Sequence, residues 1–160
     1  MTTFINLIRN EPPACYRTPP VPGCPMCTKW QEDADLRIVE LDACYVVLNR
    51  DQFFAGYCFV FTKAHVTELF HLDVETRQGI IEEVNAVAAA LHRVFSPTKL
   101  NYELLGNMVP HMHWHLVPRF SDGPLWPQPI WSEAHAELRL TDSGYTQRVG
   151  LIREALQNTF

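Results

Sequence analysis

The sequence predicts an α+β domain with an antiparallel five-stranded sheet, one long crossing helix and a C-terminal helix. Short apolar runs between residues 37 and 62 are typical of strands, and residues 73–96 carry apolar side chains at helical spacing. Three histidines then alternate with hydrophobic residues at 111–115, which is the pattern of a further strand. The chain has 160 residues, 47% of them hydrophobic, which is enough for one domain spanning 1–160 with its own core.

The first part of the chain predicts an irregular arm followed by three strands. Residues 1–23 include the proline-rich stretch EPPACYRTPPVPG and show little periodicity. The runs at 37–41, 44–49 and 56–62 are rich in β-branched and aromatic residues. The third run is nearly all apolar, which favours a central and buried position. We expect these three strands to form an antiparallel meander.

A helix is expected between Asp73 and Ser96. Asp73 is a suitable N-cap residue, and Glu75 lies where the positive end of the helix dipole favours a carboxylate. Ser96 precedes Pro97, and a residue before proline disfavours helical backbone angles, so the helix ends there. The apolar residues between these ends recur every three or four positions and form one stripe: Ile80, Val84, Val87, Leu91 and Val94.

Two more strands and a tail complete the predicted fold. The runs at 99–106 and 111–118 are expected to pair, with Pro118 ending the second strand because proline cannot donate to the ladder. The tail at 120–160 begins with FSDGPLWPQPIWSEAH, whose aromatic residues and prolines indicate that it is ordered against the rest of the protein. An amphipathic helix is expected from about Tyr145 to Leu156.

Composition and charge exclude several classes of protein. The net charge is -5 and no cluster of lysine and arginine stands out, so nucleic-acid binding through charge is not expected. No apolar run reaches the length of a membrane span, and the N-terminus lacks the apolar core of a signal peptide. Cys44 and Cys58 lie within apolar runs and are expected in the core. The odd number of cysteines, five, favours a reducing compartment, the cytoplasm.

The stretch HMHWHLVPR, residues 111–119, is the main chemical signal. On a strand, residues two apart share a face, so His111, His113 and His115 would form one row about 13 Å long. The spacers are hydrophobic and would face the core. Imidazole serves as nucleophile, proton carrier and metal ligand, so this row predicts a functional site rather than a sheet that exposes three polar rings by chance.

These motifs resemble the histidine triad (HIT) family of nucleotide hydrolases and transferases, which has three histidines separated by hydrophobic residues. LNRDQFFAGYCFVFTKAH is similar to the family's ribose-binding strand and loop, and LLGNMVPHMHWHLVPR to its catalytic hairpin. The resemblance covers roughly residues 24–132, and PLWPQPIW resembles the tail of a bacterial branch. It implies the HIT-like fold, a homodimer, and enzymes such as diadenosine polyphosphate hydrolases.

The resemblance also implies a role for each histidine. His113 would be the nucleophile that attacks the α-phosphate of a nucleotide conjugate, forming a covalent intermediate from which water releases a nucleoside monophosphate. Its other ring nitrogen would donate to the backbone carbonyl of His111. His115 would donate to phosphate oxygens in the transition state.

Three asparagines are candidate substrate-binding residues. Asn107 lies before the triad, where its amide can donate to phosphate, although Gly106-Asn107 could simply form a hairpin turn. Asn49 matches the family position that binds the ribose hydroxyls, and its alternative is a turn residue at a strand end. Asn101 is a weaker candidate for the same ribose site.

The sequence departs from the family at two places. Some members have a hydroxyl just before the triad that protonates a leaving amine, whereas this chain has Met108, Val109 and Pro110. This favours anhydride substrates over phosphoramidates, although a phosphoramidate hydrolase stays an alternative. Tyr57 occupies a position where many members have histidine, and the sequence offers no account of it. A rival from another class is a nucleotide-binding or sensing protein with little turnover.

A structural zinc is the expected cofactor, with no organic cofactor. Cys24 and Cys27 in CPMC have a spacing that lets both thiolates bind one metal, although a redox pair has the same spacing. Zinc-containing relatives add two histidines, and the matching positions here are His65 and His111. The resemblance therefore implies a Cys2His2 site without an open position for substrate.

The remaining histidines and tryptophans are assigned to packing or to the surface. His71, His92 and His135 have no partner motif and are expected on the surface. Trp114 would point away from the triad, into the core or a subunit contact. For Trp126 and Trp131, packing of the tail is favoured over covering a nucleotide site.

Overall fold

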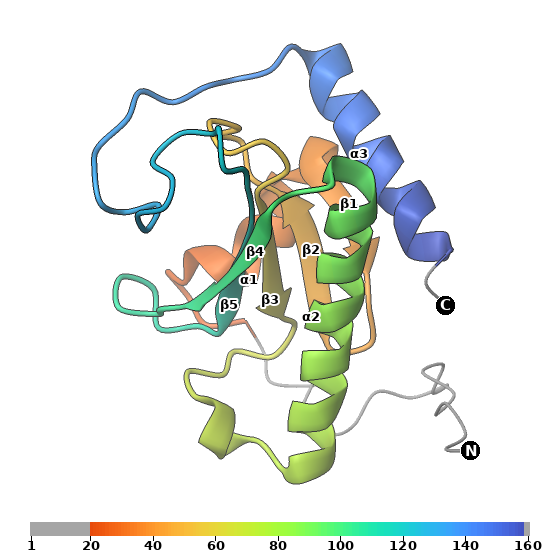
Figure 1. The fold of residues 1–160 in the computed structure, drawn as a ribbon. Coiled ribbons are helices and arrows are strands. Elements are labelled where there is room, and N and C mark those ends of the chain that lie inside the picture. Colours follow the sequence, from red (N-terminus) through yellow and green to blue (C-terminus); the bar gives the residue numbers. More distant parts are fainter. Residues whose placement is uncertain (1–19, 159–160) are drawn as a thin grey trace, which may run out of the picture.

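The computed structural model describes residues 20–158, so most of the predicted arm at 1–23 lies outside the described residues. Within them a five-stranded antiparallel sheet has the order β1-β2-β3-β5-β4 (Figure 1). The strands are β1 (Arg37–Glu40), β2 (Cys44–Leu48), β3 (Cys58–Thr62), β4 (Lys99–Leu104) and β5 (His113–Arg119). The helices are α1 (Pro25–Glu32), α2 (Val74–Phe95) and α3 (Asp142–Gln157), with 3-10 turns at Ala34–Leu36 and Leu69–His71. The predicted α+β class and the meander of the first three strands are confirmed.

The ends of the long helix follow the predicted signals. The Asp73 carboxylate accepts a hydrogen bond from the backbone N–H of Thr76 at 2.8 Å, as an N-cap residue does. Ser96, at the other end, has a left-handed backbone conformation, and Pro97 follows it. The last helix begins earlier than Tyr145, at Asp142, because the Thr141 side chain caps it by accepting from Gly144.

The histidine strand differs from the prediction at both ends. β5 begins at His113, so His111 lies just before the strand, and it continues through Pro118 to Arg119. The expectation that Pro118 ends the strand is therefore wrong. β3 pairs with β5 only as far as Leu116, so among the strands of residues 20–158 only β4 lies beside Pro118. A proline is tolerated where one side of a strand has no ladder to donate to.

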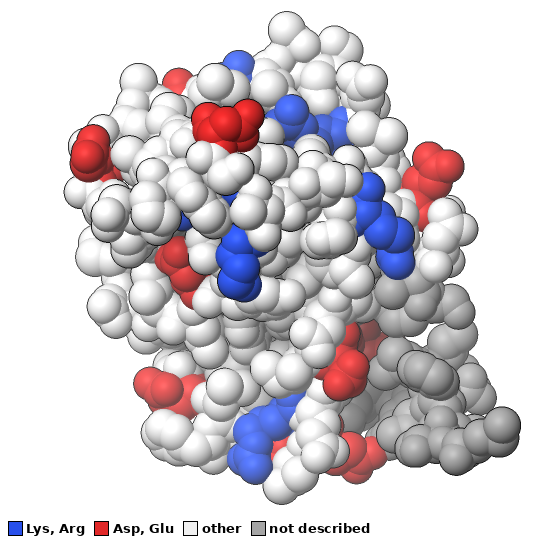
Figure 2. All heavy atoms as spheres, viewed as in Figure 1, with Lys and Arg blue, Asp and Glu red and all other residues white. Residues whose placement is uncertain are grey.

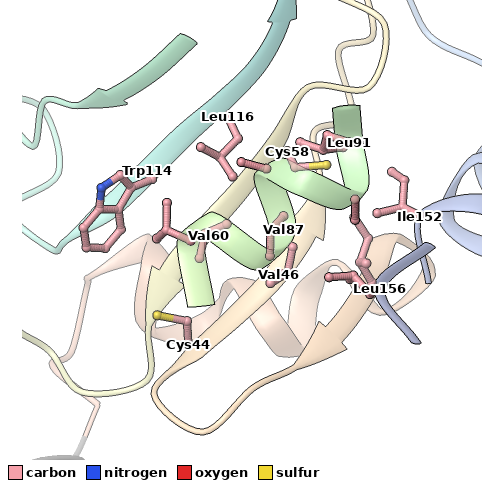
Figure 3. Close-up of a cluster of buried hydrophobic side chains, with 14 of the residues drawn as sticks. Cys44, Val46, Cys58, Val60, Val87, Leu91, Trp114, Leu116, Ile152 and Leu156 are labelled. Carbon is pink, nitrogen blue, oxygen red and sulfur yellow. The ribbon is translucent and has the colours of Figure 1, made fainter. Parts of the chain in front are cut away.

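The sheet carries a large apolar core on the face covered by α2 and α3 (Figure 1). Figure 3 shows side chains from the sheet meeting those of both helices. Cys44 and Cys58 are fully buried in this core, and Trp114 lies in it too, as predicted. The predicted apolar stripe of α2 faces the same core, except that Val94 is only partly buried.

Helix α1 lies on the opposite face and was not predicted from the sequence. Cys24 is its N-cap residue and Pro25 its first residue, a position at which proline is well tolerated. Trp30 stacks on Tyr45 of β2 with ring centroids 4.5 Å apart. The carbonyl of Trp30 also accepts a hydrogen bond from Arg37 at 2.6 Å. These tertiary contacts, rather than an apolar stripe, hold α1 on the sheet.

Charged groups are mixed over the face drawn in Figure 2, where acidic and basic side chains are interspersed among uncharged ones. None of the described helices is both long enough and apolar enough to cross a membrane.

A buried carboxyl on α2 should make stability depend on pH. Glu83 accepts a hydrogen bond from the backbone N–H of Ala43 at 2.8 Å, and burial raises its pKa from 4.5 to about 7. The folded state then binds the proton more tightly than the unfolded state does. The contribution of Glu83 to the free energy of unfolding therefore falls as the pH rises from about 4.5 to 7. Denaturant unfolding of the wild type and Glu83→Gln at pH 5.5 and 8 should show the wild type losing about 2 kcal/mol relative to the variant.

Glu82→Gln, which changes an exposed neighbour on the same helix, is the matched control for that comparison. A stability difference between wild type and Glu83→Gln that stays constant between the two pH values would refute the assignment.

Candidate active site and metal centre

The histidines of β5 lie on the sheet face opposite α2. The register pairs Phe59 with His115 and Phe61 with His113, so alternation places all four side chains on this face. The Phe59 ring centroid lies 5.1 Å from that of His115 and 6.2 Å from that of His113. The two histidines are thus positioned by a rigid central pair of strands and backed by an aromatic ring.

The ring of His113 is oriented by the backbone. Its Nδ1 lies 2.6 Å from the carbonyl oxygen of His111. A carbonyl can only accept, so Nδ1 carries the proton and Nε2 carries a lone pair. This is the hydrogen bond that the family resemblance implied, and it leaves Nε2 chemically suited to attack an electrophile.

The ring of His115 has a different partner, the hydroxyl of Tyr57, which forms a hydrogen bond with Nδ1. Both side chains are buried. Burial lowers the pKa of His115 to about 4, so the imidazole is neutral at pH 7. Burial also raises the pKa of Tyr57, which keeps the phenol protonated. Sequence reasoning missed this contact, because the two residues are 58 positions apart.

His111 faces a cluster of sulfur and nitrogen atoms. Its Nε2 donates to the carbonyl oxygen of Thr62 at 2.8 Å, which leaves Nδ1 without the proton. This Nδ1 lies 3.5 Å from the sulfur of Cys24 and 3.6 Å from that of Cys27. Burial lowers the pKa of His111, so the ring is in the neutral form that a metal ligand needs.

His65 completes the cluster. Its Nδ1 lies 3.5 Å from the Cys27 sulfur, and the four potential ligand atoms all lie within 4.8 Å of one another. Tetrahedral zinc, with bonds of about 2.3 Å to sulfur and 2.05 Å to nitrogen, holds S and N about 3.6 Å apart. Three sulfur–nitrogen separations among the predicted ligands, of 3.5, 3.6 and 3.5 Å, therefore fit zinc. Both cysteines are free, with no disulfide between them.

Asn49 lies at the end of β2, beside Tyr57. Its backbone N–H donates to the carbonyl of Tyr57 at 2.9 Å, and its own carbonyl accepts from Gln52 at 2.6 Å. Alternation from Val47 places its side chain on the triad face. The side-chain amide has no hydrogen-bond partner within residues 20–158, so it is available to a ligand.

The other two asparagines lie elsewhere. Asn107 is exposed in the loop between β4 and β5, after Gly106 with its positive φ of 72°. Asn101 lies on β4, and its side chain accepts from Arg119 at 3.0 Å. Because β3 and β5 separate β4 from β2, Asn101 is about 14 Å from the strand of Asn49 and does not share its site.

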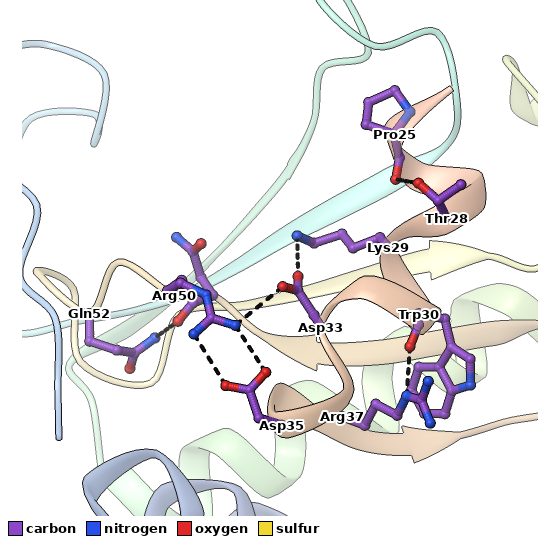
Figure 4. A network of polar contacts seen from close by, with 10 residues as sticks. Pro25, Thr28, Lys29, Trp30, Asp33, Asp35, Arg37, Arg50 and Gln52 are labelled. Carbon is purple, nitrogen blue, oxygen red and sulfur yellow. Dashed lines mark hydrogen bonds and ion pairs between the residues drawn. The ribbon is translucent and has the colours of Figure 1, made fainter. Parts of the chain in front are cut away.

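Charged side chains join α1 to the loop that follows Asn49 (Figure 4). Arg50 contacts Asp33 at 3.4 Å and Asp35 at 3.0 Å, and Lys29 contacts Asp33 at 2.7 Å. The hydrogen bond from Arg50 lowers the pKa of Asp35. This network holds the end of α1 next to the predicted ribose-binding residue.

The tail passes over the same end of the sheet. Ile130 is buried against Phe54, Tyr57 and Val117. The indole of Trp131 donates to Glu103 on β4, and its ring meets that of His115 edge to face, with centroids 5.3 Å apart. The tail is therefore ordered as expected. Trp131, however, also contacts the triad, which the expected packing of the tail alone does not explain.

The surface assignment of the remaining histidines holds for two of the three. His71 and His92 are exposed. His135 is a correction, because it is half-buried, contacts Asp51 at 2.9 Å and stacks on Phe53 with centroids 4.0 Å apart. These partners come from a loop 84 positions away, which no local pattern could indicate.

Comparisons with known proteins identify the family and the fold. The HIT domain family model matches residues 31–122. The Protein hit of Bacillus subtilis (strain 168) is 26% identical over an alignment of 92 residues that covers 54% of this chain and 63% of that protein. The match thus spans less than two thirds of that relative.

Solved structures share the fold. A histidine triad protein from Bradyrhizobium japonicum has a TM-score of 0.71 and 23% identity, covering 79% of this chain and 94% of its own. A Zn-bound histidine triad family protein from Mycobacterium smegmatis has a TM-score of 0.61 and 22% identity, covering 85% and 94%. Diadenosine triphosphate hydrolase from Plasmodium falciparum has a TM-score of 0.59 and 16% identity, covering 78% of each chain. Because the family model matches more than half of the sequence, this chain belongs to the HIT domain family.

Proposed function

We propose that this protein is a nucleotide hydrolase that cleaves a dinucleoside polyphosphate, or a similar nucleotide conjugate, at the α-phosphate and releases a nucleoside monophosphate. The observation that carries the proposal is the hydrogen bond of 2.6 Å between His113 Nδ1 and the His111 carbonyl, which leaves a lone pair on Nε2. The structural likeness to a diadenosine triphosphate hydrolase supports the same class of substrate.

The first step forms a bond between His113 Nε2 and the α-phosphorus, while the bond from phosphorus to the bridging oxygen breaks. The leaving phosphate takes that electron pair and departs as an anion. The ring becomes cationic, because Nδ1 keeps its proton, and the His111 carbonyl then accepts a stronger, charge-assisted hydrogen bond.

Water completes the reaction by attacking the same phosphorus. The P–N bond breaks, its electron pair returns to His113 Nε2, and the water proton passes to solvent. His115 donates to a phosphate oxygen as negative charge develops, and Asn107 adds a second donor from its loop. The stretch of Met108, Val109 and Pro110 before the triad offers no hydroxyl to protonate a leaving amine, which favours anhydrides over phosphoramidates.

Zinc is part of the proposal as a structural ion held by Cys24, Cys27, His65 and His111, whose ligand atoms lie close enough to share it. When bound, it would tie α1 to the segment that precedes β5 and would take no part in the reaction. Zinc binding needs reduced thiols, so the proposal includes a reducing compartment such as the cytoplasm.

A homodimer is also proposed, with β4 at the contact. β4 is an edge strand of the sheet, and an unpaired edge can add a strand from a second copy. Exposed apolar side chains gather on and just after it: Tyr102, Leu104, Leu105 and Met108.

A panel of nucleotide conjugates tests the proposed function. The purified protein should release nucleoside monophosphate from dinucleoside polyphosphates. It should prefer ribose over 2'-deoxyribose substrates by about 10-fold in kcat/KM, because the Asn49 side chain is proposed to bind the sugar hydroxyls. Binding without release of monophosphate would favour the rival nucleotide-binding protein. Equal kcat/KM for the ribose and 2'-deoxyribose substrates would contradict a contact between Asn49 and the 2'-hydroxyl.

A further inference from the structure

The two histidines at the proposed phosphate site form hydrogen bonds of opposite kinds. His113 Nδ1 meets the backbone carbonyl of His111, and His115 Nδ1 meets the hydroxyl of Tyr57. A carbonyl oxygen can only accept, whereas a phenolic hydroxyl has a proton to donate. The two rings lie side by side, with centroids 5.0 Å apart, yet they are not equivalent.

The direction of the Tyr57 hydrogen bond follows from burial. Tyr57 is only 6% exposed, and within residues 20–158 its hydroxyl has His115 Nδ1 as its one hydrogen-bond partner. If Nδ1 carried the proton, the buried O–H of Tyr57 would have no acceptor, which costs about 1–3 kcal/mol. The hydroxyl therefore donates, and Nδ1 accepts. A neutral imidazole that accepts at Nδ1 carries its proton on Nε2.

We propose that Tyr57 is a positioning residue that fixes His115 as the Nε2–H tautomer, so that His115 presents a donor to phosphate while His113 presents a lone pair. The role in turnover rests on the proposed function, whereas the tautomer is a property of the free protein. In the opposite tautomer, His115 would direct a lone pair at an anionic substrate and would repel it.

The Tyr57 ring is held firmly enough to act in this way. It packs among Phe54, Val117 and Ile130, which come from the loop before β3, from β5 and from the tail. Its backbone carbonyl accepts from the N–H of Asn49, the proposed ribose-binding residue. The hydroxyl is thus placed by contacts on several sides, and its position is fixed before substrate arrives.

Tyrosine at this position has a consequence that histidine would not have. An imidazole can donate or accept depending on its own tautomer. A phenol that stays protonated has one proton and gives it to His115. The tyrosine in this chain therefore assigns the two nitrogen atoms of His115 without ambiguity.

The test is the ¹⁵N NMR spectrum of the histidine rings in zinc-replete protein without substrate, with His115 assigned by its loss in His115→Gln. In the wild type, His115 Nδ1 should be unprotonated and Nε2 protonated. Tyr57→Phe, which removes only the hydroxyl, should shift His115 toward a mixture of tautomers or toward Nδ1–H. Tyr102→Phe changes a tyrosine that pairs with Leu116, on the sheet face opposite the triad, and should leave the spectrum of His115 unchanged.

Kinetics supply a second readout. Tyr57→Phe should lower kcat on a dinucleoside polyphosphate by about 10- to 100-fold, with little change in KM, zinc content or melting temperature. Wild-type His115 protonated on Nδ1 would overturn the inference whether or not Tyr57→Phe folds. Tyr57→Phe with unchanged tautomer and kcat would overturn it too. If the wild type turns over no nucleotide, the proposed function fails, and the wild-type tautomer still decides the role of Tyr57.

Discussion

His113→Ala should abolish turnover, with kcat falling by on the order of 10⁴-fold or more. The reason is that the substitution removes the atom that forms the bond to phosphorus, and His115 presents a donor rather than a lone pair. Nucleotide binding should persist, because Asn49 and Asn107 lie on other segments. The measurements are steady-state hydrolysis of a dinucleoside polyphosphate and calorimetric binding of a nucleoside monophosphate.

The matched control is His115→Ala, which removes a donor instead of the nucleophile and should cost about 100-fold in kcat. Zinc content should be unchanged in both variants, since neither residue belongs to the metal cluster. A His113→Ala protein that retains near-native kcat would eliminate the covalent mechanism.

Cys24→Ser should release zinc and lower the free energy of unfolding by about 3–5 kcal/mol, because loss of a structural metal is among the most destabilising changes. For a chain of this size the melting temperature should fall by roughly 10 °C. Metal analysis of protein purified without chelator should find about one zinc per wild-type chain. The variant should also lose part of its kcat, because His111 both faces the cluster and accepts from His113.

Cys58→Ala is the control, since Cys58 is a core residue outside the cluster. It should be destabilised by loss of packing but should keep its zinc. Metal-free wild-type protein with unchanged stability, or a native disulfide between Cys24 and Cys27, would contradict the assignment.

Local patterns in the sequence were sufficient to predict most of the fold. The strands and α2 follow periodicities that arise within each segment, and Asp73 and Ser96 end α2 as expected. Helix α1 was not predicted because its sequence, PMCTKWQE, has no apolar stripe at helical spacing and buries only Met26. Its stability comes from contacts made across the fold, such as the stacking of Trp30 on Tyr45, which no local pattern contains.

The candidate site also contains residues that the sequence predicted and residues that it could not predict. The triad and the metal cluster were predicted because their spacing resembles that of a known family, and the structure brings the four metal-ligand candidates together. The surroundings of His115 were not predictable. Tyr57 contacts it from the residue just before β3 and Trp131 from the tail, and both contacts form only when the chain has folded.

The stereochemical outcome at phosphorus tests the central claim most directly. A dinucleoside polyphosphate with a chiral thiophosphate at the α-position, hydrolysed in ¹⁸O-labelled water, reports whether phosphorus is displaced once or twice. Attack by His113 followed by attack by water comprises two in-line displacements, so the account predicts overall retention of configuration. Inversion would mean that water attacks the substrate directly and would contradict a covalent nucleotidyl-His113 intermediate.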